Sequence, residues 1–146
     1  MKRNFLTLLI IACSFMPVVA QVQLILGDWY TVDDKTGESY SIVHIYKGEN
    51  GKYYGKITAM LIPGTENEVC RDCTGADKNK PVLGMVIIRD MVEKDGALTG
   101  GKVLDPETGN FYYGKISYDN GRLKLRGSID KLGVLGRSQH WKRKNE

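Results

Sequence analysis

Histidine and cysteine are scarce in this sequence of 146 residues, which has only two histidines and three cysteines. A structural zinc site needs four ligands drawn from cysteine, histidine and carboxylate side chains. Neither His44 nor His140 stands at a zinc-finger spacing from Cys70 and Cys73. We therefore expect no metal site and no cofactor.

Familiar catalytic motifs are also absent. The sequence has no G-x-S-x-G, no H-E-x-x-H and no Walker loop. Asp33, Asp34 and Asp105 fall in turns, where aspartate is favoured because its side chain bonds nearby backbone groups. An envelope enzyme of the hydrolase type, which would use His44 or His140 with an aspartate, stays open as an alternative, although neither histidine has a visible partner.

Excess charge and long apolar runs are both limited. The net charge is +4, and it falls to +2 if the first twenty residues, with Lys2 and Arg3 and no acidic residue, are removed. A nucleic-acid-binding domain would cluster many more basic residues on one face, so we expect no nucleic-acid partner. Apart from the first twenty residues, no stretch approaches the length of about 20 apolar residues that spans a membrane, so we expect no transmembrane segment in the mature chain.

Residues 1–20 have the pattern of a secretory signal peptide. A basic start is followed by the mostly apolar stretch from Phe5 to Met16 and by short side chains before a cut after Ala20. We expect export to the periplasm or the medium and a mature domain of residues 21–146. The alternative is a lipobox that ends at Cys13, which would then carry a lipid anchor.

Cys70 and Cys73 stand two residues apart in VCRDCTG, and such a pair can hold a metal, carry out redox chemistry or form a disulfide. An exported chain meets an oxidising compartment, where thiols pair. A thioredoxin-like site would sit between a strand and a helix, and no convincing amphipathic helix lies nearby. A disulfide is therefore favoured, and it would fix the shape of the polar loop from Pro63 to Pro81.

Turn residues and short runs rich in β-branched and aromatic residues alternate along the mature chain, and we expect no helix. Such runs predict strands. We expect eight of them, at residues 28–32, 40–47, 52–59, 84–89, 97–104, 110–118, 122–129 and 136–142. Successive strands joined by tight turns form an antiparallel meander, and eight strands close into a barrel that can hold one small ligand. The predicted fold is all-β, with a single antiparallel up-and-down barrel.

Two tryptophans lie at the ends of this predicted barrel. Residues 27–29 (GDW) open the first strand, and Arg137 and Trp141 lie on the last strand, which would be its neighbour. The arrangement resembles the G-x-W signature of lipocalins, whose tryptophan packs under a C-terminal arginine at the closed end. The resemblance implies a lipocalin-like architecture in which Trp29 is buried and Arg137 or Arg126 covers its ring.

Five longer segments resemble a bacterial family. They are GDWYTVDDKTGESYSIVHIY, CRDCTGADKNKPVLGMVIIR, GGKVLDPETGNFYYGKI, LKLRGSI and LGRSQHW. Their order and spacing are similar to an exported family catalogued as domain of unknown function 2147, from about Gly27 to Arg143. The resemblance implies a single β-rich, barrel-like domain exported by bacteria, and it implies no activity.

Aromatic residues on the predicted strands favour a binding role. Amphipathic rings that line a cavity suit a small ligand that is partly apolar, although tyrosine is common in β-sheets for other reasons. The ligand-binding candidates are His44, Tyr46, Tyr53, Tyr113 and Arg126. We expect His44 to lie in the core or to line the barrel, and Arg126 would anchor an anionic head group if the interior were polar.

The predicted strand at 122–129 has the clearest alternation. Leu123, Leu125 and Ile129 share one face, and the basic residues between them share the other. We expect the apolar face to be buried and the basic face to be solvated.

The leading hypothesis is an exported, non-catalytic protein that binds a small, partly apolar or amphipathic ligand or a cell-envelope component. A cavity lined by aromatic groups would favour it. A cleft that holds a histidine against a carboxylate would favour the enzyme. A filled interior with an exposed apolar patch would favour a structural or protein-interaction module.

Overall fold

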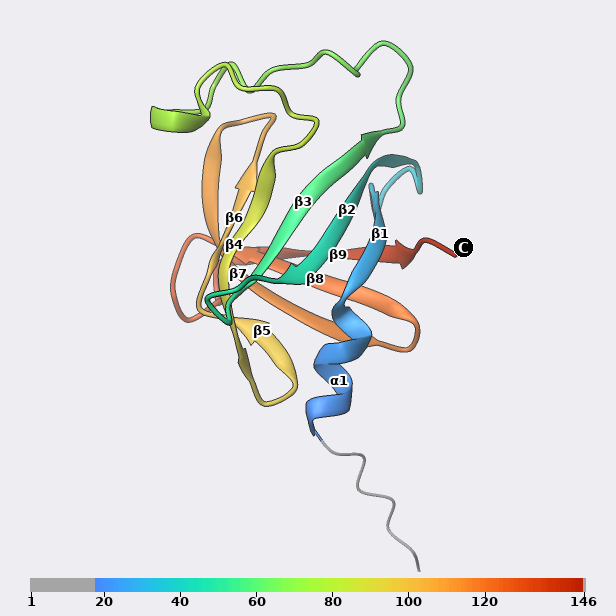
Figure 1. Cartoon of the computed structure of the whole chain (residues 1–146), viewed down its shortest axis with the longest axis vertical. Coiled ribbons are helices and arrows are strands. Elements are labelled where there is room, and N and C mark those ends of the chain that lie inside the picture. The colour runs from blue at the N-terminus through green and yellow to red at the C-terminus, as the bar shows by residue number, and fades with distance from the viewer. Residues whose placement is uncertain (1–17, 146) are drawn as a thin grey trace, which may run out of the picture.

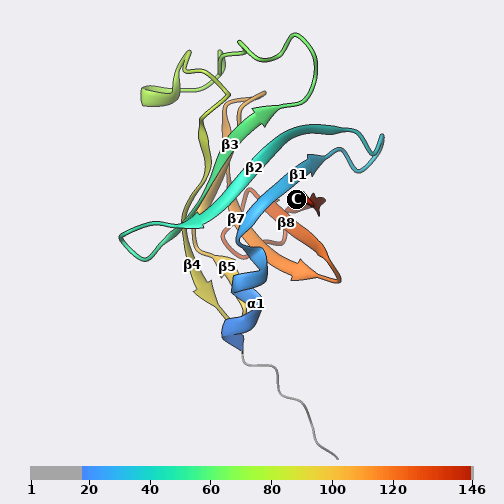
Figure 2. The same cartoon turned by 45° about the vertical axis from the view of Figure 1, so that its right-hand side comes forward.

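Nine antiparallel strands form one sheet that closes on itself (Figures 1 and 2). The structure is a computed structural model that describes residues 18–145, so most of the predicted signal peptide, residues 1–17, lies outside the described residues. The strand order is β3-β2-β1-β9-β8-β7-β5-β4-β6, and the pairing of β3 with β4 joins the two ends. The predicted antiparallel barrel is confirmed.

Most strands follow the predicted runs closely, but β4 begins two residues later than the run predicted at 84–89 and continues five residues beyond it. The strands are β1 (Gly27–Val32), β2 (Ser39–Lys47), β3 (Tyr53–Met60), β4 (Val86–Lys94), β5 (Ala97–Thr99), β6 (Lys102–Asp105), β7 (Asn110–Asp119), β8 (Arg122–Ser128) and β9 (Gly136–Arg143).

One predicted strand, at residues 97–104, is divided into β5 and β6. Both lie between β4 and β7, so nine strands fill eight places in the barrel wall. Gly101 stands at the break, where a Cβ atom would come within 2.1 Å of the Arg89 carbonyl oxygen. The backbone therefore passes too close to β4 at this point for any residue with a side chain.

The helix α1 (Val18–Ile25), which the sequence did not lead us to expect, covers the lower end of the barrel in Figure 1. Val22 and Ile25 are buried, and the Ile25 carbonyl accepts a hydrogen bond of 2.8 Å from Trp29 Nε1. The helix spans the predicted cleavage site after Ala20. A chain that began at Gln21 would keep both buried side chains.

Trp29 is fully buried, as predicted, but a different arginine covers its ring. The guanidinium carbon of Arg143 lies 4.0 Å from the ring centroid. The same guanidinium donates hydrogen bonds to the carbonyls of Leu24 and Leu26, close to the C-terminal end of α1. A cation near the C-terminus of a helix is favourable because the unpaired carbonyls there carry partial negative charge.

The prediction that Arg126 or Arg137 covers Trp29 is therefore wrong, and strand register explains why. β1 pairs with β9 at only two positions, and Trp29 lies opposite Arg143. Arg137 is six residues earlier in the chain, at the far end of β9, where it is exposed and lies opposite Gly127 on β8. The second predicted structural tryptophan, Trp141, is buried opposite Leu123.

Side chains fill the barrel interior. The core is formed by buried residues from every strand, among them Trp29, Val43, Ile88, Met91, Leu98, Ile116 and Leu123, each with an exposed fraction of 0%. A side chain with no exposed surface has no space for a water molecule against it. The interior around these residues therefore has no room for a ligand.

A long loop, residues 61–85, joins β3 to β4 and lies over the upper end of the barrel (Figure 1). It contains the 3-10 helix η1 (Gly75–Asp77) and the predicted disulfide between Cys70 and Cys73, and both cysteines are buried. Gly109, in the turn between β6 and β7, lies against the disulfide. A Cβ atom there would come within 2.1 Å of the Asp72 carbonyl oxygen. The loop is thus packed onto the barrel.

Candidate functional site

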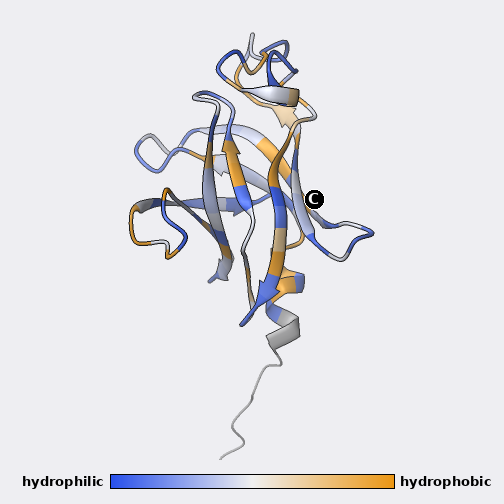
Figure 3. Ribbon diagram, turned by 90° about the vertical axis from the view of Figure 1, so that its left-hand side faces the viewer, coloured by the Kyte–Doolittle hydropathy of each residue, from blue (hydrophilic) through white to orange (hydrophobic). Residues whose placement is uncertain are grey.

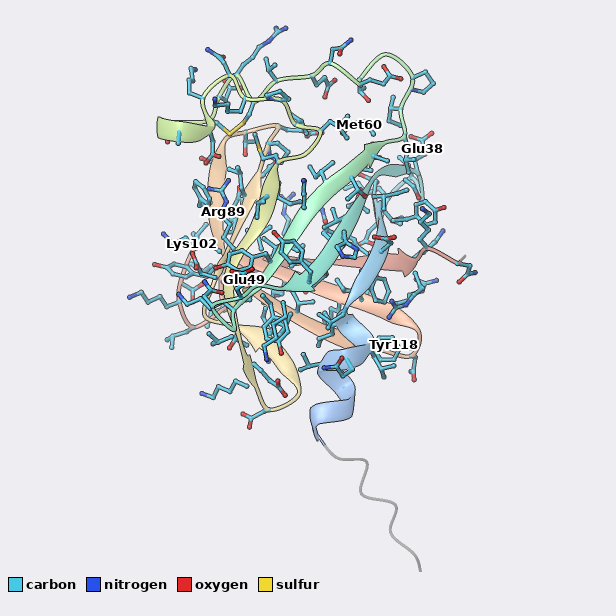
Figure 4. All side chains as sticks on the ribbon, viewed as in Figure 1. Glu38, Glu49, Met60, Arg89, Lys102 and Tyr118 are labelled. Atoms are coloured by element: carbon cyan, nitrogen blue, oxygen red, sulfur yellow. A yellow bond between two sulfur atoms is a disulfide. The ribbon has the colours of Figure 1, made fainter. Side chains whose placement is uncertain are left out.

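A hollow of about 560 Å³ lies on the outer wall of the barrel, where β2, β3 and β4 are neighbours. It is lined by Tyr46, Gly48, Glu49, Asn50, Tyr54, Val86, Arg89 and Asp90. Figure 4 shows the hairpin with Glu49 below Arg89, which lies between this hairpin and the long loop. We call these eight residues the outer hollow.

Three aromatic rings form a row along the outer wall. His44 and Tyr46 are two residues apart on β2, so they point to the same side of the sheet. Tyr46 lies opposite Tyr54 on β3. The His44 and Tyr46 rings stack with centroids 5.9 Å apart, and the Tyr46 and Tyr54 rings do so at the same distance. The last two rings give the hollow a flat apolar surface.

A short polar network borders these rings. The side-chain amide of Asn50 donates a hydrogen bond of 2.7 Å to the Tyr54 hydroxyl, which donates one of 3.1 Å to Asp90. Asp90 has a φ of 56°, in the left-handed region, at an irregularity in the pairing of β3 with β4. Such a bulge redirects a side chain, and here the carboxylate of Asp90 faces the hollow.

Arg89 links the hollow to the long loop. Its two terminal nitrogens donate hydrogen bonds of 2.9 and 2.8 Å to the carboxylate of Asp77 in η1. Its Nε donates to the Val86 carbonyl, and its guanidinium carbon lies 5.3 Å from the Phe111 ring centroid. These hydrogen bonds from Arg89 hold the pKa of Asp77 below its ordinary value, although burial acts in the opposite direction.

Acid should lower the free energy of unfolding partly through protonation of Asp77. Because its pKa is lower in the folded chain, the stabilisation is complete above the unfolded value of about 3.9 and is lost as the pH falls through the folded value. We expect the free energy of unfolding, measured by urea denaturation, to fall less in Asp77→Asn than in wild type between about pH 6 and pH 2.5. Asp95→Asn, in an exposed turn, is the control and should keep the wild-type slope. Equal slopes for Asp77→Asn and wild type would contradict this role.

His44 does not line the interior, contrary to our expectation. Val43 and Ile45 on either side of it take the inward positions and are buried, so His44 points outward. Its side chain is 46% exposed, and Nδ1 lies 2.7 Å from Asp28 Oδ1. A second pair joins His140 to Asp34, with Nδ1 and Oδ2 3.9 Å apart. Neither pair belongs to the outer hollow.

The other predicted ligand-binding residues do not converge on one cavity. Tyr53 faces inward and is buried, and its hydroxyl donates to Glu93. Tyr113 lies on β7, and the centroid of its ring is 5.8 Å from Lys102 Nζ. Arg126 lies at a second, smaller hollow of about 150 Å³ with Lys115, Ser117 and Lys124. Of the five predicted ligand-binding residues, only Tyr46 lines the outer hollow, and the His44 ring stacks on the Tyr46 ring.

Sequence reasoning missed Tyr54, Arg89 and Asp90. Tyr54 could have been predicted to face outward, because adjacent residues on a strand face opposite sides and Tyr53 is buried. Arg89 and Asp90 were not, because the bulge that turns them outward depends on how β3 and β4 pair. In the part of the chain from 18 to 145, no group of three His, Cys, Asp or Glu residues could hold a metal ion. None of the helices described there is long and apolar enough to cross a membrane.

Comparisons with known proteins agree with the barrel. The bacterial family described as "Uncharacterized protein conserved in bacteria (DUF2147)" matches residues 27–143. No curated protein matches the sequence. A solved structure of protein HP1028 from Helicobacter pylori, described as belonging to the lipocalin family, is similar with a TM-score of 0.71 and 23% identity over 83% of each chain. At this identity the likeness concerns the fold.

Proposed function

Because the chain belongs to the uncharacterized bacterial family DUF2147 and folds as a lipocalin-like barrel, we propose that it is an exported, non-catalytic binding protein. Its ligand would be a small, partly apolar molecule or a cell-envelope component. The outer hollow would hold this ligand, because side chains fill the barrel interior. The filled interior and the exposed apolar loop 129–135 also meet the condition set above for a structural or protein-interaction module, which is kept as an alternative.

The observation that carries this proposal is the pair of stacked tyrosines in the outer hollow, beside a polar network. Ligand sites combine apolar and aromatic surface with a few placed polar groups. The outer hollow offers both, and because it is wide open to solvent, a ligand would lie against the tyrosine rings without being enclosed. A ring with an apolar face would stack on Tyr46 and Tyr54, and a hydroxyl or amine on its edge would reach the carboxylate of Asp90.

Two features support the export part of the proposal. Disulfides persist in oxidising compartments, and the Cys70–Cys73 bond is buried within the long loop. The cut after Ala20 would leave in place Val22 and Ile25, the α1 residues whose burial the structure describes. N-terminal sequencing of the native protein decides this point, since a chain that starts at Gln21 supports export and a lipid-modified Cys13 contradicts the proposed cut.

Truncating Tyr54 should weaken binding at the hollow. We expect Tyr54→Ala to bind about tenfold less tightly, because it loses one ring face and the hydroxyl that positions Asp90. The measurement is saturation-transfer NMR with a panel of small aromatic and saccharide probes, followed by titration of those that bind.

Tyr113→Ala is the matched control, since Tyr113 is a half-buried tyrosine on another part of the barrel. It should leave the affinity of each probe unchanged. Probes that bind Tyr54→Ala as tightly as wild type would place the site elsewhere.

The pair His44–Asp28 is the observation that favours the enzyme instead. At 2.7 Å, Asp28 orients the imidazole in the way that a carboxylate orients a general base. The exposed position of the pair on the outer wall leaves a substrate in contact with water. The test is whether wild type chemically converts a bound probe. If it does, and if His44→Gln still binds the probe but no longer converts it, an enzymatic proposal replaces the binding proposal.

A further inference from the structure

The loop between β8 and β9, residues 129–135, is rich in apolar residues (Figure 3), and four of its large apolar side chains are exposed. The exposed fractions are 67% for Ile129, 89% for Leu132, 70% for Val134 and 61% for Leu135. The expectation that Ile129 shares the buried face of Leu123 and Leu125 is wrong, because β8 ends at Ser128 and the chain then leaves the sheet.

This loop is held in shape by hydrogen bonds that leave the apolar side chains outside. The carboxylate of Asp130 accepts bonds of 3.0 and 2.7 Å from the backbone N–H groups of Val134 and Leu135. Arg126 reaches from β8 to donate to the carbonyls of Gly133 and Val134. An ordered loop loses little conformational entropy when its side chains enter another apolar phase.

Basic side chains lie next to the loop on the outer wall. Lys115 pairs with Arg126 across β7 and β8, and Ser117 pairs with Lys124, so these four side chains share one face and line the hollow of about 150 Å³. Lys131 adds an exposed amine within the loop. The nearby carboxylate of Asp130 is turned toward the loop's own N–H groups, which stabilise its charge and lower its pKa.

We propose that this surface binds an anionic lipid bilayer. Leu132, Val134 and the other exposed apolar residues of the loop enter the boundary between head groups and acyl chains. Lys115 and Lys124 of the small hollow contact lipid phosphates, since the guanidinium of Arg126 is already bonded to the loop. Apolar insertion combined with attraction to anionic lipids is the ordinary basis of interfacial binding. A partner without negative charge would leave the cations of the hollow without complementary groups, and this favours an anionic surface.

The test is flotation of the purified full domain with vesicles of phosphatidylglycerol and phosphatidylcholine, compared with phosphatidylcholine alone. We expect the partition coefficient to be at least about tenfold higher with the anionic vesicles. The reason is that each cation near an anionic surface contributes about 1 kcal/mol to binding, which is about fivefold in the partition coefficient. Lys115→Gln with Lys124→Gln should remove most of this preference and most of its salt dependence. Leu132→Ser with Val134→Ser should lower the partition coefficient about tenfold at every salt concentration.

Matched controls use residues of the same types elsewhere. Leu83→Ser replaces a leucine of the long loop that is 42% exposed, and Lys80→Gln with Lys94→Gln removes two exposed lysines from other segments. Both should bind vesicles as wild type does, and circular dichroism should show all variants folded. Equal binding to both vesicle types, or unchanged binding by Leu132→Ser with Val134→Ser, would overturn the proposal. A third outcome would also overturn it. If wild type binds no vesicles but self-associates in light scattering, and Leu132→Ser with Val134→Ser does not self-associate, the loop is a protein interface.

Discussion

Replacing Trp29 by alanine is expected to lower the free energy of unfolding by about 3–5 kcal/mol. The ring is fully buried, and it joins three parts of the closed end: the Ile25 carbonyl of α1, the guanidinium of Arg143 and the core of the barrel. Its loss would leave a large cavity and remove the hydrogen bond that fixes the helix. Urea denaturation followed by circular dichroism measures the change.

The two arginines provide the control for this account of the closed end. Arg143→Met should cost on the order of 1–2 kcal/mol, because it removes the cation over the ring and the hydrogen bonds to α1. Arg137→Met, at an exposed position, should stay within about 0.5 kcal/mol of wild type. An unfolding midpoint of Trp29→Ala equal to that of wild type, or a larger cost for Arg137 than for Arg143, would refute this arrangement.

Placing alanine at Gly109 should have the second largest effect, a loss of about 2–4 kcal/mol. Two costs add. Gly109 has a φ of 71°, which is unfavourable for a residue with a side chain. The new methyl group would also meet the backbone of Asp72 and Cys73 at less than van der Waals distance. The β6–β7 turn and the disulfide segment would have to move apart.

Gly37→Ala separates the two costs. Gly37 has a similar φ of 74°, but a Cβ atom there would meet nothing within 4 Å. It should therefore show only the conformational cost of about 1–2 kcal/mol in the same urea experiment. If Gly109→Ala costs no more than Gly37→Ala, the long loop is not packed against the β6–β7 turn.

The sequence predicts the fold well because strands and turns are local. Each run of β-branched and aromatic residues is bounded by residues that favour turns, and successive hairpins leave few ways to close a barrel. The helix α1 was missed because its apolar residues continue the apolar pattern of the signal peptide. The end of β8 was misplaced by one residue, and that error put Ile129 in the core.

The site could be predicted only in part, because it depends on how distant strands pair. Alternation along β2 could have shown that His44 and Tyr46 share a face, but assigning that face to the interior or the exterior required knowing that Val43 and Ile45 are buried. The arginine over Trp29 depends on the register of β1 with β9, which join residues more than a hundred positions apart. No local pattern specifies that register.

The most direct test of the binding site is a crystal structure of the protein purified from its native host, with any ligand that it retains. We predict density for a small molecule against the rings of Tyr46 and Tyr54, within reach of Asp90. Density inside the barrel, among Trp29, Ile88 and Leu123, would contradict the account, because it would show that the interior opens for a ligand and that the outer hollow is not the site.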